Sequence, residues 1–223
     1  MSRSTLIALA VLIVCPATSI ASLADSPVDS TTAGSLLMAF DGGFVYGRSV
    51  QPARWDSGTA FSLTGWYHFS RNVAVGILAG SAGWDINLDT LYDELGGNDR
   101  DAIAFQAFGG SAQFQLSLLA RRWFDRGFWR FRSFAQGSVG FYRENHDIEA
   151  ELLYADGPAG TDVASISEHT NTNRIGFGLA AGGSVPFTSH SFLDIYPSYH
   201  MAFRKGTFSY WTLSIGFRVD LRM

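Results

Sequence analysis

The sequence predicts an all-β protein, and more narrowly an eight-stranded antiparallel up-and-down β-barrel that spans a membrane. Apolar and polar residues alternate with a period of two in one segment after another, as in strands whose two faces meet different surroundings. Glycine (24 residues) and aromatic residues (18 Phe, 8 Tyr, 6 Trp) are abundant. The apolar face of these segments carries no charged residue except Arg122 near one end. Because an Arg or Lys on a lipid face at mid-bilayer costs about 2 to 4 kcal/mol, this exclusion favours a membrane barrel over a soluble sheet.

The beginning of the chain predicts a secretory signal peptide. Arg3 precedes the apolar run 6–14, which is too short to span a bilayer, and small residues suited to cleavage follow it. We predict a signal peptide over residues 1–24, cleaved between 21 and 24, and one domain over residues 25–223; the alternative is a buried helix or an uncleaved anchor. Cys15 is the only cysteine, so the mature chain is expected to have no disulfide and no cysteine nucleophile.

Four strands are predicted in the first half of the chain. They cover residues 35–47, 59–69 and 73–84 and a fourth segment that includes 113–118, while the strand phase of residues 102–112 stays open. The outward apolar positions are Leu36, Met38, Phe40, Phe44 and Tyr46, then Phe61, Leu63, Tyr67 and Phe69, then Val75 and Ile77, then Phe114, Leu116 and Leu118.

Four further strands follow in the second half. The fifth includes residues 129–142, and the others cover 173–186, 192–203 and 214–223. Their outward positions are Trp129, Phe131, Val139 and Phe141, then Ile175, Phe177, Leu179 and Val185, then Leu193, Ile195, Tyr199, Met201 and Phe203, then Ile215, Phe217, Val219, Leu221 and Met223. An even number of strands, each long enough for the ~9 to 11 residues of a tilted membrane strand, is typical of bacterial outer-membrane barrels.

Two long segments between these strands are acidic. Residues 85–101 and 143–172 hold thirteen of the twenty acidic residues and only two of the sixteen basic ones. Because the long loops of such barrels face outward, both segments are expected to be loops on the cell surface. They form either a hydrophilic coat or a surface that binds an extracellular ligand or bridges to lipopolysaccharide through divalent cations. Neither has the ligand spacing of a calcium loop, so we predict no metal site and no cofactor.

The chain resembles the family of eight-stranded outer-membrane β-barrel domains, which includes the membrane domain of OmpA-type proteins and the small opacity-type and Ail-like surface proteins. The resemblance rests on "GWYHFSRNVAVGI" (Gly65–Ile77), "RRWFDRGFWRF" (Arg121–Phe131) and the terminal "SIGFRVDLRM". It implies a location in the outer membrane of a Gram-negative-type bacterium, among outer-membrane lipid and lipopolysaccharide.

The last strand of this family carries the signal that the barrel-assembly machinery reads. The resemblance implies that role for Ser214, Gly216, Val219, Leu221 and Met223, and it implies the machinery as a partner during biogenesis. The chain departs from the family where it ends on Met223 rather than Phe or Trp, and where Val219 and Leu221 replace the preferred aromatic residues.

The inward positions are expected to fill the barrel, because an eight-stranded barrel is just wide enough for side chains. Charges buried there need partners, and both signs are present. The predicted lumen network consists of Asp41, His68, Arg130, Arg132, Asp194, His200, Arg218 and Asp220. Arg121 is also expected to face inward. We expect these side chains to plug the lumen, and a narrow channel for small solutes is the alternative.

An enzyme that modifies lipid A is a further alternative. Ser198 and His200 share the inward face of the seventh strand, but "PSYHMAF" lacks the His-x-Ser-Asn order of the deacylase family. The inward phase also points both groups away from lipid, where a nucleophile and its base would have to act. We therefore expect no enzymatic activity, and the dispersed basic residues predict no nucleic-acid binding. The expected function is that of a structural or surface protein whose acidic loops serve adhesion or binding.

Overall fold

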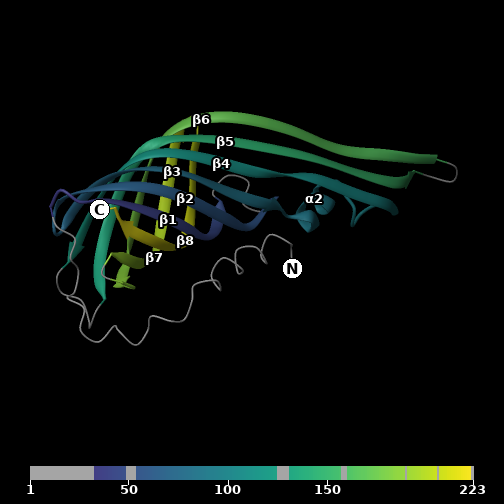
Figure 1. The fold of residues 1–223 in the computed structure, drawn as a ribbon. Coiled ribbons are helices and arrows are strands. Elements are labelled where there is room, and N and C mark those ends of the chain that lie inside the picture. The colour runs from purple at the N-terminus through teal and green to yellow at the C-terminus, as the bar shows by residue number, and fades with distance from the viewer. Residues whose placement is uncertain are drawn as a thin grey trace.

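The protein forms a closed barrel of eight antiparallel strands, each paired with its neighbours in the chain and the last with the first (Figure 1). The computed structural model describes residues 33–48, 54–124, 131–156, 160–188, 190–204 and 206–221. The strands are β1 (Leu36–Arg48), β2 (Trp55–Ser70), β3 (Val73–Ile86), β4 (Ala102–Phe124), β5 (Arg132–Asp156), β6 (Gly160–Pro186), β7 (Ser191–Arg204) and β8 (Gly206–Asp220). The predicted fold class is confirmed. The predicted signal peptide, Trp129, Arg130 and Met223 lie outside the described residues.

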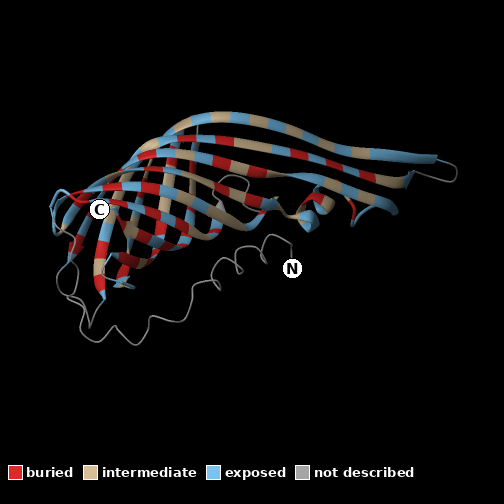
Figure 2. Ribbon diagram, in the orientation of Figure 1, coloured by how far each residue is buried: buried red, intermediate tan, exposed pale blue. Residues whose placement is uncertain are grey.

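Alternate residues face outward and inward, as the sequence predicts. On β1, Phe40 is 53% exposed and Asp41 is 4% exposed, and on β8, Phe217 is 40% exposed and Arg218 is 1% exposed. Phe40 and Phe217 lie opposite each other where β1 and β8 close the ring. The exposed and buried residues alternate along the ribbons of Figure 2. The outer surface is therefore apolar, which suits contact with lipid rather than water.

Two exposed arginines mark the ends of this apolar surface on neighbouring strands. Arg122 lies near the turn end of β4, and Arg143 of β5 lies opposite Phe114 of β4. About eight residues of β4 separate the two levels, which is roughly 26 Å of strand at ~3.3 Å per residue. A tilt of about 40° shortens this to roughly 20 Å, comparable with the ~25 Å apolar band of outer-membrane barrels. Both arginines can extend their heads toward lipid headgroups.

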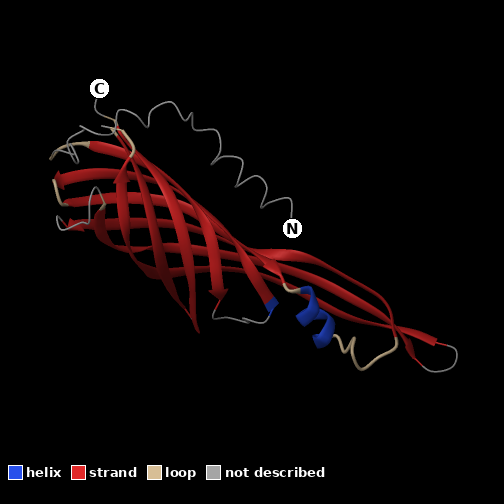
Figure 3. Cartoon of the chain, turned by 90° about the horizontal axis from the view of Figure 1, so that it is seen from below, coloured by secondary structure: helices blue, strands red, loops and turns tan. Residues whose placement is uncertain are grey.

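Three strands continue far beyond the barrel, so the prediction of a loop over residues 143–172 is wrong. β5 and β6 stay paired out to Asp156 and Gly160, without a register shift. β4 accompanies them from Ala102 onward. Figures 1 and 3 show the three strands running on past the others. We call residues 102–110, 147–156 and 160–174 the projecting sheet.

The segment 85–101 is not a plain loop either, which corrects the second loop prediction. After the end of β3, Asn87 caps helix α2 (Leu88–Glu94) by accepting a hydrogen bond from the backbone N–H of Thr90 at 2.9 Å. Leu91 of this helix and Leu95 just after it are 0% and 6% exposed and pack on the inward side of the projecting sheet. No helix in the part of the chain that the structure describes is long and apolar enough to cross a membrane.

Candidate functional site in the lumen and the projecting sheet

A buried carboxylate, Asp194, is the centre of the charged interior near the turn end of the barrel. Arg121 donates a hydrogen bond to it and forms an ion pair with it. The Nε of Arg218 lies 3.4 Å from the same Oδ2 atom. Arg218 also donates to Ser184 at 2.9 Å, and Arg121 donates to Gln136 at 2.9 Å. One carboxylate from β7 is thus the shared ion-pair partner of two guanidinium groups, from β4 and β8.

Aromatic rings complete the surroundings of the two arginines. The guanidinium carbon of Arg121 lies 4.0 Å from the ring centre of Phe134 and 4.7 Å from that of Trp66. The guanidinium carbon of Arg218 lies 4.4 Å from the ring centre of Phe192. A cation over a ring is stabilised by about 2 kcal/mol when both are desolvated. The rings therefore offset the positive charge that one carboxylate leaves over.

Two other residues of the predicted network make separate contacts. Asp41 accepts a hydrogen bond from Ser62 at 3.1 Å, in the middle of the barrel. Arg132 donates to the side chain of Asn72 at 2.8 Å, at the turn end. The set that the structure brings together is thus Asp194 and Arg218 with Arg121, which the predicted network lacked although its inward position was expected.

The remaining predicted residues also point into the barrel. His68 is 1% exposed and stacks on Trp123, with 4.9 Å between ring centres. Asp220 is 6% exposed and lies opposite Leu37 in the closing strand pair. Of the residues expected to form the assembly signal, Ser214, Gly216, Val219 and Leu221 belong to or directly follow the closing strand.

A cavity of about 50 Å³ with a mixed polar and apolar lining lies in the middle of the lumen. Asp41, Gln113, Ser198 and His200 are among the residues that line it. Since one water molecule needs ~10 to 15 Å³ of cavity volume, the cavity has room for a few water molecules. Ser198 Oγ lies 3.0 Å from His200 Nε2, and the other ring nitrogen lies 3.4 Å from the hydroxyl of Tyr142. This serine and histidine therefore meet inside the barrel, on the face away from lipid.

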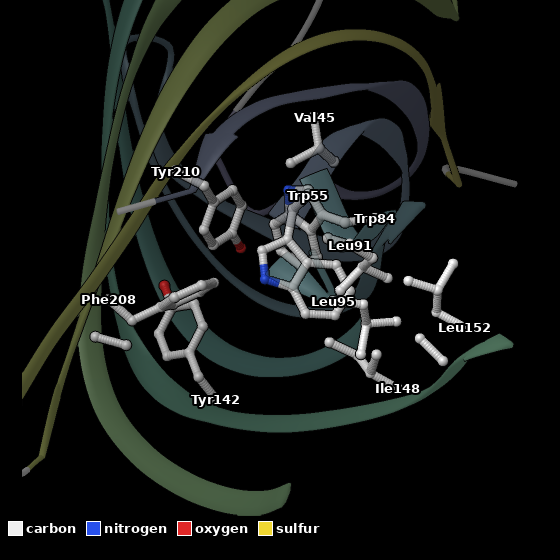
Figure 4. Close-up of a cluster of buried hydrophobic side chains, with 13 residues drawn as sticks. Val45, Trp55, Trp84, Leu91, Leu95, Tyr142, Ile148, Leu152, Phe208 and Tyr210 are labelled. Atoms are coloured by element: carbon white, nitrogen blue, oxygen red, sulfur yellow. The ribbon is translucent and has the colours of Figure 1, made fainter. Parts of the chain in front are cut away.

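Buried aromatic residues fill the lumen toward the loop end (Figure 4). Trp84 packs edge to face against Phe208 and Tyr210, with ring centres 5.8 and 5.2 Å apart. Trp55 and Tyr142 belong to the same cluster, which continues into Leu91 of α2 and Leu95 just after it. Packed side chains thus lie on both sides of the central cavity, charged and aromatic on one side and mainly apolar on the other.

The projecting sheet has an apolar face and an acidic face. Ile148, Ala150 and Leu152 of β5 are at most 1% exposed and belong to the cluster that α2 covers. Asp147, Glu149 and Glu151 alternate with them and face away. The hydrogen bond from Gln106 to Glu151 (3.0 Å) lies on this outer face. The acidic residues therefore form a charged surface held in strand geometry.

Arg54 fastens the projecting sheet to the barrel. It lies directly before β2 and donates to Glu94 of α2 at 2.9 Å and to Glu168 of β6 at 2.7 Å. The hydrogen bond to Glu94, with that to Glu168, raises the pKa of Arg54 above its usual value. Arg174 forms a similar ion pair with Glu144 (3.2 Å) where β6 leaves the barrel. These contacts join three elements that are distant in sequence.

One edge of the projecting sheet is unpaired. Pairing of β6 with β7 ends at Ile175 and Phe203, whereas β6 continues to pair with β5 up to Gly160. Among the described residues, no strand pairs with the other edge of β6 over residues 160–174. Among the described residues, no three His, Cys, Asp or Glu side chains are arranged to hold a metal ion.

The closed ring, the outward apolar band and the filled lumen define an eight-stranded β-barrel of the outer-membrane type. No protein-family model matches the sequence, and no curated protein sequence matches it. Solved structures are similar in fold. Neisserial surface protein A is 14% identical over 85% of this chain and 98% of its own, with a TM-score of 0.54.

Two proteins of Pseudomonas aeruginosa are also similar. OprG is 15% identical over 86% of this chain and 98% of its own, with a TM-score of 0.48. The N-terminal β-barrel domain of OprF is 10% identical over 86% of this chain and 100% of its own, with a TM-score of 0.45. At 14% identity, the similarity to Neisserial surface protein A concerns the fold alone.

Proposed function

We propose that the protein is a surface protein of the outer membrane of a Gram-negative-type bacterium, which displays the projecting sheet outside the cell and binds an extended segment of another protein there. The observation that carries this proposal is the unpaired edge of β6 over residues 160–174. An extended segment adds to such an edge through main-chain hydrogen bonds, and side-chain contacts supply specificity.

The edge lacks three of the features that usually prevent strand addition, namely proline, lysine and a bulge. Residues 160–174 contain no proline and no lysine, and the β5–β6 register has no bulge. Natural edge strands are commonly protected by those features. Two copies in one membrane point their sheets in the same direction, so their β6 strands do not meet antiparallel. This favours a partner from outside the membrane.

The outer face of the sheet specifies the charge of that partner. Asp147, Glu149 and Glu151 lie one strand away from the edge, on a single face. Ala164 and Ile166 lie on the other face of β6 and pack against the apolar cluster. The best partner segment therefore alternates Lys or Arg with apolar residues.

The test shortens the projecting sheet and leaves the barrel unchanged. Ile148 and Glu168 lie opposite each other, so residues 149–167 can be replaced by Asn-Gly, which favours a two-residue hairpin. Cells that display the wild type are expected to bind an immobilised peptide array that alternates Lys or Arg with apolar residues, and cells that display the shortened variant are not. Heat-modifiable gel migration checks that both barrels are folded. Equal binding by both would refute the proposal.

Two proline variants separate the edge from the acidic face. Consecutive residues of a strand direct their N–H groups to opposite edges. Ser167 and Thr170 are an odd number of positions apart, so only one of Ser167→Pro and Thr170→Pro removes a donor from the free edge. The other substitution removes a donor that pairs with β5 and is expected to make the projecting sheet sensitive to protease. The variant that stays resistant is therefore the one that lacks a donor on the free edge. It is expected to lose peptide binding, whereas Glu149→Gln with Glu151→Gln is expected to lose only the preference for basic peptides.

A narrow channel is the second candidate, and the central cavity favours it because Asp41, Gln113 and other polar residues take part in its lining. The packed layers on both sides of that cavity favour a plug. Steady single-channel conductance of the purified protein in planar bilayers would support the channel, and a silent bilayer with folded protein would support the plug.

A further inference from the structure

A polar hollow lies on the outer surface of β4, β5 and β6, just beyond the apolar band. It has a volume of about 390 Å³, and Gly110, Ala112, Asn145, Asp147, His169 and Asn171 are among the residues that line it. This volume falls within the ~300 to 1,000 Å³ of typical small-ligand sites. The six residues form two rows across the sheet, Ala112–Asn145–Asn171 and Gly110–Asp147–His169.

The hollow lies at the level along the barrel where lipid headgroups surround a membrane-spanning barrel. The row directly on the barrel side consists of Phe114, Arg143 and Asn173, where the apolar band ends. At ~3.3 Å per residue, the hollow begins roughly 7 Å along β4 from Phe114. Because the six residues of the two rows share the outward face with the lipid-facing side chains, the hollow opens toward the surrounding leaflet.

The floor of the hollow exists because Gly110 has no side chain, and the backbone does not require glycine there. A Cβ at Gly110 would meet only the carbonyl oxygen of Trp84, at an ordinary 3.4 Å. The neighbouring Gly109 differs, since its φ is +132° and a Cβ would lie 2.0 Å from the carbonyl oxygen of Asp147. Glycine at 109 is thus explained by the fold, whereas glycine at 110 is explained by the open space that it leaves.

The wall of the hollow presents neighbouring hydrogen-bond donors and acceptors. Asn145 and Asn171 lie opposite each other, and His169 Nδ1 lies 3.7 Å from a carboxylate oxygen of Asp147. The amide oxygen of Asn145 is buried and has no hydrogen-bond partner among the described residues, so a ligand would reach it only after the side chain turns. An amide, a carboxylate and an imidazole side by side suit vicinal hydroxyl groups, which both donate and accept.

Two exposed rings lie on the same face of β4, one on each side of this floor. Phe108 is 64% exposed and Phe114 is 53% exposed. An apolar ring beside polar groups suits a sugar, which has C–H faces and hydroxyl edges. The carboxylate of Asp147 disfavours a phosphate in the hollow, because like charges repel.

We propose that this hollow binds the saccharide portion of a glycolipid of the surrounding outer leaflet. The proposal rests on the outer-membrane location proposed above, but not on the unpaired edge of β6. A glycolipid held there would anchor the base of the projecting sheet to the membrane surface.

The test compares nanodiscs that differ only in lipid. Wild-type protein is placed in phospholipid alone, with lipopolysaccharide that retains its core sugars, or with lipid A that lacks them. Retention of glycolipid after exchange into excess phospholipid nanodiscs is measured by native mass spectrometry. We expect at least tenfold more retention of the lipopolysaccharide than of lipid A.

Three variants locate the site. Gly110→Trp fills the hollow and Asn145→Ala with Asn171→Ala removes its amides, so both are expected to lower retention at least tenfold. Gly65→Trp is the matched control, because Gly65 also faces outward with open space around its Cβ position and lies on β2. It is expected to retain lipopolysaccharide as the wild type does. If Gly110→Trp does not fold, the asparagine variant carries the test.

Several outcomes would overturn the proposal. One is equal retention of lipopolysaccharide by the wild type and all variants, and another is retention of lipid A equal to that of lipopolysaccharide. A third is binding of delipidated core oligosaccharide, in phospholipid nanodiscs, as tight as that of lipopolysaccharide, which would identify a free saccharide as the ligand. Peptide binding by the free edge of β6 is measured separately, so failure of either proposal is recognisable without the other.

Discussion

Removing the charge of Asp194 is expected to destabilise the barrel strongly. This carboxylate is 1% exposed, and it is the ion-pair partner of both Arg121 and Arg218, each 2% exposed. Asp194→Asn keeps the size of the side chain and leaves the two buried guanidinium groups without their shared ion-pair partner. Breaking a buried pair from one side costs about 3 to 5 kcal/mol. Since two cations lose their partner, we expect a value near the upper end, about 5 kcal/mol.

Urea unfolding of the protein in lipid vesicles measures this free energy. Trp66 and Trp123 are 2% exposed and lie beside the arginines, so their fluorescence follows the loss of this layer. Ser184→Ala is the control, because it removes the hydrogen bonds of Ser184 to Arg218 and Asp194 and leaves the ion pairs, with an expected loss of about 1.5 to 3 kcal/mol.

A second variant tests the reasoning independently of the single substitution. Arg121→Met, Asp194→Leu and Arg218→Met together replace the charges by apolar groups of similar volume. Such a replacement is often neutral or stabilising. We expect it to recover most of the stability that Asp194→Asn loses. If Asp194→Asn costs less than about 1 kcal/mol, the two arginines do not depend on this carboxylate and the reasoning fails.

Three further predictions concern the outer surface, the projecting sheet and its attachment. Phe217→Arg is expected to destabilise the barrel by about 2 to 4 kcal/mol in vesicles, because it places a charge on the lipid face, and an unchanged urea midpoint would contradict the outward assignment. Gly109→Ala is expected to make the projecting sheet sensitive to protease through its φ of +132°, with Gly110→Ala as a resistant control; equal digestion would refute this. Arg54→Gln is expected to speed cleavage near α2, because it weakens the contacts to Glu94 and Glu168, and cleavage at the wild-type rate would show that those contacts do not hold the sheet.

The faces of the barrel could be predicted from the sequence because lipid imposes a strict rule on every strand. Each second residue either meets hydrocarbon or points into the lumen, so Phe217 and Arg218 are assigned by alternation alone. The structure gives them exposures of 40% and 1%. Phe217 and Arg218 lie on β8, the strand that closes the ring with β1.

The projecting sheet was missed because its acidic residues hide the same alternation. Ile148, Ala150 and Leu152 repeat with a period of two, but Asp147, Glu149 and Glu151 between them made the segment resemble a solvated loop. The apolar side needs a cover that no local pattern supplies. That cover is Leu91 and Leu95, more than fifty residues earlier in the chain. A period-two reading through charged segments would have extended β5 and β6 correctly.

The pairing of the interior charges follows from barrel closure and not from local sequence. Alternation tells only that Arg121, Asp194 and Arg218 point inward. Arg121 and Asp194 are 73 residues apart on β4 and β7, which are not neighbouring strands, so no cross-strand register joins them. They meet because an eight-stranded barrel is narrow enough for side chains to reach across its lumen. Which cation meets which carboxylate therefore depends on the level of each residue along the barrel axis, and a one-residue shift of a strand would turn the side chain out to lipid. The same ion pair that stabilises the interior thus also penalises any misregistered barrel, since a shifted Asp194 would be an unpaired charge facing hydrocarbon.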